Sequence, residues 1–187
     1  ACRTAIGTSF RGTFNDTSAF DLAEVVVVES LKRSGLVVDD IDDIVLAETL
    51  HGGGVIARHA AVTAGMTEVP GLAVNRHCAA SLAATNIAAA EVMVGMSDAI
   101  IAGGVNVMST GPRDTYREPG TQDVIEGWRS PTHPDRPDAP NLDMSITVGW
   151  NAAQKADVTR EEMDAWAARS HARAVAAIVA GKVVDEI

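Results

Sequence analysis

One of the two cysteines, Cys78, lies between a predicted strand and a predicted helix. Residues 72–75 form a short apolar run typical of a strand, and the alanine-rich residues 79–94 predict a helix that ends at Gly95. A cysteine at a helix N-terminus lies near the positive end of the helix dipole and near unpaired N–H groups, and both favour the thiolate. The same N–H groups can stabilise an oxyanion on a carbonyl that the sulfur attacks. These residue types therefore indicate acyl transfer through a thioester.

A purely structural role for Cys78 fits the same position. No residue from Ala79 to Ala90 is charged, which predicts a helix that is buried on every side. A free cysteine in such surroundings is commonly a small buried hydrophobe. The position alone leaves both interpretations open.

Other residues that could take part in catalysis or in ligand binding fit known motifs poorly. His77 adjoins Cys78, but adjacent residues of a strand point to opposite faces, so we do not expect a Cys–His pair. His51 opens an H-G-G-G run like an esterase oxyanion loop, yet the chain has no G-x-S-x-G element, and a glycine turn is the simpler interpretation. Gly103 and Gly104 lack the rest of a dinucleotide-binding fingerprint. The histidines show no metal-ligand spacing, so no metal site is expected.

Strands alternate with helices in the first part of the chain. The patterns predict helices at 19–34, 55–64 and 79–94 and strands at 41–48, 72–75 and 98–102. Ser18 with Asp21 predicts a capping box for the first helix, and Gly35 predicts its end. This alternation predicts an α/β layered fold, with a mixed, mainly parallel sheet between layers of helices. One of these helices is expected to be a buried central helix.

The amino-acid composition of the chain changes after Gly111. Residues 112–140 hold most of the seven prolines and predict a long surface excursion. Thr159 and Glu162 then repeat the capping pattern ahead of an amphipathic helix at 160–180. We therefore expect two domains, an α/β domain at 1–111 that carries the nucleophile and a partial loop domain at 112–187.

Composition excludes several classes of protein. Hydrophobic residues make up 47% of the chain and aromatic residues only 4%, and the net charge of −10 is not offset by any basic cluster. Nucleic acid is therefore not an expected partner. The two cysteines, Cys2 and Cys78, are too far apart in sequence to indicate a disulfide scaffold. No apolar run approaches the roughly 18 residues that a membrane span needs, and the first residues do not form a signal peptide. We expect a cytoplasmic protein.

Three linked blocks of sequence make a more specific signal. Residues 74–82 read V-N-R-H-C-A-A-S-L, residues 95–98 read G-M-S-D, and residues 101–109 read I-A-G-G-V-N-V-M-S. They resemble the V-N-(K/R)-x-C, G-x-x-D and A-G-G-x-E-x-M-S blocks around the nucleophile of thiolases. The opening R-T-A-I-G at 3–7 and the T-R-E-E-M-D at 159–164 are also similar to family stretches. The resemblance covers nearly the whole chain but only about half of a thiolase.

The resemblance implies a function. Thiolases have two similar halves whose central helices pack side by side, and the cysteine that matches Cys78 accepts an acyl group from an acyl-CoA. The enzyme forms or cleaves a carbon–carbon bond of a 3-ketoacyl-CoA in fatty acid and lipid metabolism. Its substrates are coenzyme A thioesters, and no other cofactor is implied. Met144 matches a methionine that lines the acyl pocket.

The resemblance also implies what lies outside the chain. The general base and the second catalytic cysteine belong to a C-terminal half, which we expect on the same or a separate polypeptide. Thiolases form homo-oligomers, so a dimer or tetramer is expected.

The chain departs from the family pattern at several positions. Ala80 and Ser81 stand where a glycine usually follows the cysteine, Asn106 where the family often has glutamate, and Gly149 where it has the glutamate of T-x-E-N. The added Cβ atoms at 80 and 81 narrow the space beside the thioester and argue against short-chain acetoacetyl-CoA specificity. Two alternatives stay open: a ketoacyl-synthase-type condensing enzyme, and a non-catalytic thiolase-like scaffold subunit.

Overall fold

The chain divides into two compact units. The computed structural model describes residues 1–8, 11–51, 53–131, 133–137, 139–141 and 144–186, without the side chains of 144–147. The first unit comprises residues 1–112 and 185–187, and the second comprises residues 113–184. Three short 3-10 turns lie at Val38–Asp40, Met108–Thr110 and Val184–Glu186.

A parallel sheet forms the centre of the first unit. Its strands are β1 (Asp43–Glu48), β2 (Gly71–Val74) and β3 (Ile100–Val105), in the order β2-β1-β3. Val45 of β1 is in register with Leu72 on one side and Ala102 on the other. Because β1 is central, every residue from 44 to 48 is buried. The predicted α/β fold with a mainly parallel sheet is confirmed.

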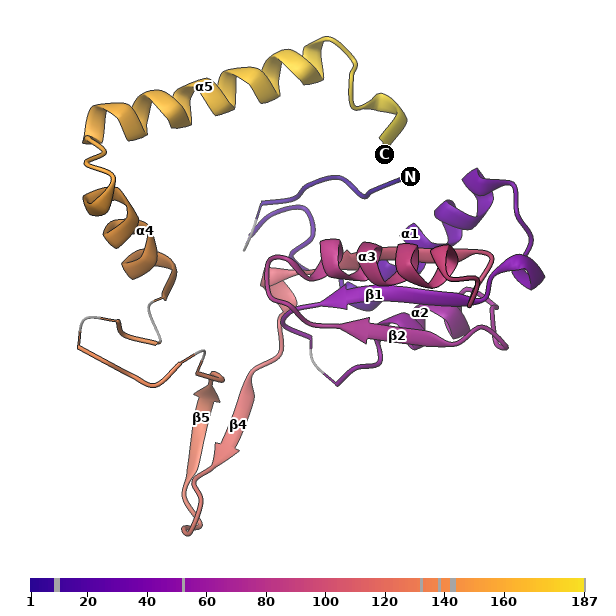
Figure 1. Cartoon of the computed structure of the whole chain (residues 1–187), viewed down its shortest axis with the longest axis horizontal. Coiled ribbons are helices and arrows are strands. Elements are labelled where there is room, and N and C mark those ends of the chain that lie inside the picture. Colours follow the sequence, from indigo (N-terminus) through magenta and orange to yellow (C-terminus); the bar gives the residue numbers. More distant parts are fainter. Residues whose placement is uncertain (9–10, 52, 132, 138, 142–143, 187) are drawn as a thin grey trace. The chain divides into compact units, whose positions relative to one another are not determined.

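Helices cover both faces of this sheet. They are α1 (Ala19–Ser34), α2 (Ile56–Thr63) and α3 (Ala80–Met93). Ile44 and Leu46 of β1 belong to the apolar core that α1 and α2 build. Alternate strand residues point to opposite faces, so Val45 and Ala47 face the layer of α3, which packs on β1 and β3. Figure 1 shows α3 alongside the labelled strands β1 and β2.

Local sequence sets the limits of α1. The Ser18 hydroxyl accepts a hydrogen bond from the Asp21 N–H at 3.1 Å, and the Asp21 carboxylate accepts one from the Ser18 N–H at 3.3 Å. Gly35 ends the helix with φ 75°, a left-handed conformation that glycine adopts without steric cost. The predicted helix at 19–34 is therefore confirmed residue for residue.

One face of α3 is open to solvent. Its buried residues are Ala80, Ala83, Ala84 and Ala88. Leu82 is 66% exposed and Met93 is 85% exposed. The prediction of a helix buried on every side is wrong for the first unit, because the sheet covers one face of α3 and no described residue of this unit covers the other.

The glycine pair after the predicted strand at 98–102 belongs to β3 itself. A Cβ on Gly104 would lie against the Ser81 hydroxyl and 2.6 Å from the Cβ of Ala47. The absence of a side chain at Gly104 thus lets the start of α3 approach the sheet.

A β-hairpin begins the second unit. It pairs β4 (Asp114–Arg117) with β5 (Val124–Trp128) in antiparallel fashion. The rings of Tyr116 and Trp128 stack across the pair with centroids 4.7 Å apart. The prediction of an irregular excursion over 112–140 missed this hairpin, which such a cross-strand aromatic pair stabilises.

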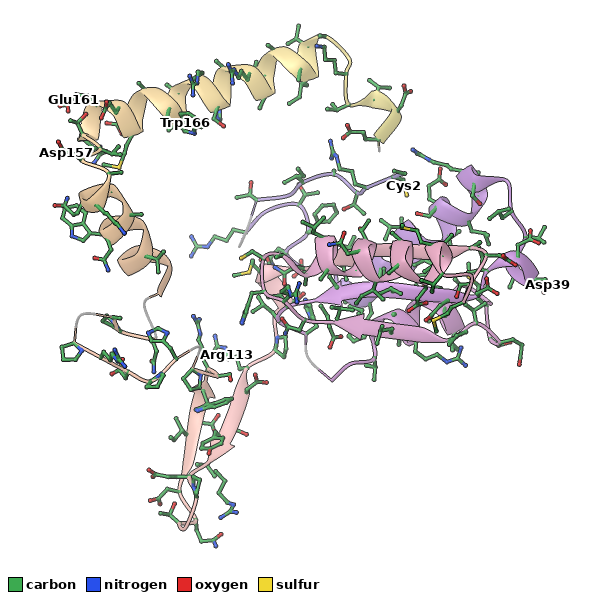
Figure 2. All side chains as sticks on the ribbon, viewed as in Figure 1. Cys2, Asp39, Arg113, Asp157, Glu161 and Trp166 are labelled. Atoms are coloured by element: carbon green, nitrogen blue, oxygen red, sulfur yellow. The ribbon has the colours of Figure 1, made fainter. Side chains whose placement is uncertain are left out.

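Two helices complete the second unit, α4 (Met144–Lys155) and α5 (Arg160–Val179). Thr159 and Glu162 form the predicted capping box at the start of α5. Figure 2 labels Glu161 and Trp166 on this helix, and Trp166 is 67% exposed. None of the described helices is long and apolar enough to span a membrane.

Candidate active site

Cys78 lies in the turn that joins β2 to α3. Ala79 is the N-cap residue of α3, and no side chain caps the first turn of the helix. The backbone N–H of Ala79 donates to the Arg76 carbonyl at 3.1 Å, and that of Ala80 donates to the His77 carbonyl at 3.0 Å. The thiol of Cys78 is exposed. In this chain Cys78 is therefore an exposed residue and not a buried hydrophobe.

His77, directly before the cysteine, has a left-handed backbone. Its φ is 46°, a region that residues other than glycine seldom occupy. β2 ends at Val74, so the strand does not continue to His77. The argument that placed His77 and Cys78 on opposite faces of a strand is wrong, because both residues belong to a turn.

Two side chains bind the backbone of this turn. The Asn75 side-chain oxygen accepts a hydrogen bond from the His77 N–H at 3.0 Å, and its amide nitrogen donates to the Thr49 carbonyl at 3.4 Å. The Thr49 hydroxyl donates to the His77 carbonyl at 3.4 Å. The sequence predicted none of these contacts. The only signal was that Thr49 directly follows one predicted strand and Asn75 ends another.

A buried carboxylate lies just before Thr49. Glu48 is 5% exposed, and its Oε1 accepts a hydrogen bond from the Gly54 N–H at 2.7 Å. Its Oε2 has no hydrogen-bond partner among the described residues. Gly53 and Gly54 have φ of 82° and 71°, so these two residues form a glycine turn, while Gly52 lies outside the described residues.

The imidazole of His51 connects this loop to the end of β3. Its Nε2 accepts a hydrogen bond from the Val107 N–H at 3.4 Å. Burial lowers the pKa of His51 below its ordinary value of 6.5, and the nearby charge of Glu48 opposes this shift only in part. The neutral ring is the form that can accept from Val107.

Two of the positions that depart from the family pattern, Ala80 and Ser81, begin α3 just after Cys78. Ala80 is buried, and the Ser81 hydroxyl faces Gly104. Asn106 is exposed just after β3. Met144 begins α4 in the second unit, and its side chain lies outside the described part of the chain. No group of three or more His, Cys, Asp or Glu among the described residues is arranged to hold a metal ion.

The second cysteine has a different environment. Cys2, labelled in Figure 2, is partly buried, with its Sγ 3.2 Å from the Ser30 hydroxyl of α1. Its sulfur therefore has a protein partner and does not lie at a helix start.

Comparisons with known proteins place these observations in a family context. The model of the family described as thiolase, N-terminal domain, matches residues 1–187. The acetyl-CoA acetyltransferase of Pseudomonas aeruginosa is 35% identical over an alignment that covers 100% of this chain and 49% of that protein. The peroxisomal 3-ketoacyl-CoA thiolase 5 of Arabidopsis thaliana is 38% identical, with 100% of this chain and 40% of that protein covered.

A solved structure agrees with these relatives. The crystal structure of the Bacillus anthracis acetyl-CoA acetyltransferase superposes with a TM-score of 0.81 at 27% identity, covering 98% of this chain and 48% of the other. The chain thus spans about half the length of the relatives that it matches.

Proposed function

The chain belongs to the thiolase family, whose N-terminal domain it matches throughout, and on that premise we propose that it supplies the acyl-accepting cysteine of an acyl-CoA C-acyltransferase. The enzyme would form or cleave a carbon–carbon bond of a 3-ketoacyl-CoA. Cys78 is the nucleophile, and coenzyme A thioesters are the substrates. The observation that carries this proposal is the exposed thiol of Cys78 at the uncapped start of α3.

The first chemical step is a transfer between two sulfurs. The Cys78 thiolate attacks the thioester carbonyl of an acyl-CoA, so a bond forms between Sγ and the acyl carbon. The bond from that carbon to the coenzyme A sulfur then breaks, and coenzyme A leaves as a thiolate that takes up a proton. The N–H of Cys78 and the positive end of the α3 dipole are suited to stabilise the tetrahedral oxyanion between these events.

The second step needs groups from outside this chain. A second acyl-CoA must lose an α-proton to a general base, and its α-carbon then attacks the acyl carbon on Cys78. The new carbon–carbon bond forms as the bond from the acyl carbon to Sγ breaks, which returns the Cys78 thiolate. We propose that the base comes from a C-terminal thiolase half, on the same or a separate polypeptide, in a dimer or tetramer. A cytoplasmic location is part of the same proposal.

In this proposal, three side chains bear on which acyl group the enzyme accepts. Ala80 and Ser81 add side-chain atoms next to the thioester, and Met144 contributes to the pocket wall. These positions support a substrate other than acetoacetyl-CoA.

Acylation of the purified protein tests the proposal. After exposure to acetyl-CoA, intact-mass spectrometry should find one added acetyl group, and peptide mapping should place it on Cys78. The Cys78→Ala variant should take up none. The Cys2→Ala variant is the matched control and should be acylated like the unsubstituted protein, because Cys2 contacts Ser30 and lies away from the start of α3.

Two other outcomes would favour the alternatives. An assembled protein that never gains an acetyl group would support a scaffold subunit, for which the replacements at Ala80 and Ser81 are the specific observation. Carbon–carbon bond formation that requires a malonyl thioester, and fails with acetyl-CoA alone, would support a ketoacyl-synthase-type enzyme.

A further inference from the structure

The turn before Cys78 is held in an unfavourable conformation by two side chains from neighbouring strand ends. We propose that Thr49 and Asn75 are positioning residues that maintain the left-handed backbone of His77 and thereby direct the thiol of Cys78 toward the acyl carbon. This inference rests on the proposed function, because it assigns Cys78 as the nucleophile.

The conformation of His77 needs an external cause. At φ 46° the Cβ of a residue such as histidine is crowded by its own backbone, so an isolated turn would favour negative φ. Strained backbone of this kind persists only where the surroundings impose it, and it is concentrated at functional sites. Here it immediately precedes the proposed nucleophile.

The surroundings of His77 provide that constraint on both sides of the residue. Its N–H donates to the Asn75 side-chain oxygen at 3.0 Å, and its carbonyl accepts from the Thr49 hydroxyl at 3.4 Å. The Asn75 amide nitrogen donates to the Thr49 carbonyl at 3.4 Å. These three hydrogen bonds form a closed network among Thr49, Asn75 and His77. Both peptide groups that flank the His77 Cα are thus tied to the same pair of residues.

The two residues are themselves anchored by the sheet. Thr49 follows the last residue of β1, Glu48, which pairs with Val105 of β3 and is buried. Asn75 follows Val74, which pairs with Ala47 of β1. Because adjacent strands fix these positions, the hydrogen-bond network holds the turn in a fixed position relative to the sheet.

The expected benefit is orientation of the nucleophile. If this hydrogen-bond network is broken, His77 can relax to negative φ. That change rotates the following peptide and moves the Cys78 sulfur. Displacement of a reacting group by about 1 Å can slow a reaction about a hundredfold. Such a change should affect attack on a bound thioester much more than attack on a small reagent that approaches from solvent.

The test uses substitutions that remove one hydrogen bond each. Thr49→Val keeps the shape of the side chain and removes its hydroxyl, while Thr49→Ser keeps the hydroxyl. Asn75→Asp keeps the acceptor for the His77 N–H and removes the donor to Thr49. Thr63→Val is the matched control, because the Thr63 hydroxyl also donates to a backbone carbonyl, that of His59 at 3.0 Å, but lies on α2.

Three quantities are measured in the purified full-length protein. They are the rate constant of Cys78 acetylation at saturating acetyl-CoA, the acetyl-CoA concentration that gives half of that rate, and the rate of Cys78 alkylation by iodoacetamide. Thr49→Val and Asn75→Asp should lower the acetylation rate constant about tenfold to a hundredfold, and Thr49→Val should leave the other two quantities unchanged. The new carboxylate of Asn75→Asp disfavours the Cys78 thiolate, so this variant should lose more acetylation than alkylation. Thr49→Ser and Thr63→Val should behave like the unsubstituted protein.

Each contrary result has a distinct meaning. Acetylation by Thr49→Val and Asn75→Asp at the original rate would overturn the positioning role while leaving the function of Cys78 intact. Equal losses of acetylation and alkylation would also overturn it, because the thiolate itself would then be affected. If the unsubstituted protein takes no acetyl group on Cys78, both the inference and the proposed function fail. Asn75→Asp provides the same comparison if Thr49→Val does not fold.

Discussion

His51 makes the stability of the first unit depend on pH. Its ring is held in the neutral form by partial burial, which lowers its pKa, and its Nε2 accepts from the Val107 N–H. An unfolded chain therefore binds the proton more readily than the folded one. The resulting stability is fully present above pH of about 6.5 and is lost as the pH falls toward the lowered folded pKa.

The prediction is that His51→Gln flattens this dependence. Glutamine can still accept from Val107 through its amide oxygen but has no proton to bind in this range. The free energy of unfolding, measured by urea denaturation between pH 7 and pH 5, should fall less steeply with acid for His51→Gln than for the unsubstituted protein. Equal slopes would show that His51 does not contribute, because the other histidines are common to both proteins.

The sequence singled out Cys78, whose role as nucleophile stays a prediction, but it did not show the geometry of the turn. Residue type and the start of an uncharged helix are local features, so both were visible in the sequence. The left-handed conformation of His77 depends on Thr49, which is distant in sequence and reaches His77 only because β1 and β2 pair. The buried carboxylate of Glu48 was likewise invisible, since its burial comes from the central place of β1.

At the scale of elements, the contact of α3 with β3 depends on a missing side chain. A Cβ at Gly104 would meet the Ser81 hydroxyl and the Cβ of Ala47, whereas one at Gly103 would meet only the Leu46 side chain at an ordinary 3.6 Å. Gly104→Ala should therefore lower the free energy of unfolding by about 1–3 kcal/mol through overpacking.

Gly103→Ala is the control for this prediction. It makes the same chemical change one residue earlier in β3, where no close contact results. Chemical denaturation should find Gly103→Ala close to the unsubstituted protein in its midpoint. Similar losses in both variants would indicate a general cost of alanine in β3 and not a close approach of α3.

Elements with local signals were predicted well, and the others were missed. The limits of α1 follow from Ser18, Asp21 and Gly35, all adjacent to the helix, so the sequence sufficed. The hairpin of β4 and β5 lies among prolines and lacks a long alternating pattern, and pairing such as that of Tyr116 with Trp128 becomes visible only in three dimensions. The helix α4, which directly follows the proline-rich stretch, was missed as well.

At the scale of the whole molecule, α3 combines a composition typical of an interior with a face that is open to solvent. Leu82 is 66% exposed and Met93 85% exposed, although the helix is uncharged from Ala80 to Ala90. A helix of this composition is typical of a protein interior. The composition of α3 therefore predicts a burial that the described residues of the first unit do not supply. We expect the C-terminal thiolase half to cover this face.

Leu82→Gln tests that expectation. In the segment 1–187 alone the side chain is largely in water, so the substitution should leave the free energy of unfolding nearly unchanged. In an assembly with the proposed C-terminal thiolase half, loss of a buried leucine should cost about 1.5–3 kcal/mol. Val37→Gln is the matched control, because Val37 is 62% exposed at a turn and should be neutral in both settings. If Leu82→Gln were neutral in that assembly as well, the face of α3 would remain in solvent, and its apolar residues would need another partner.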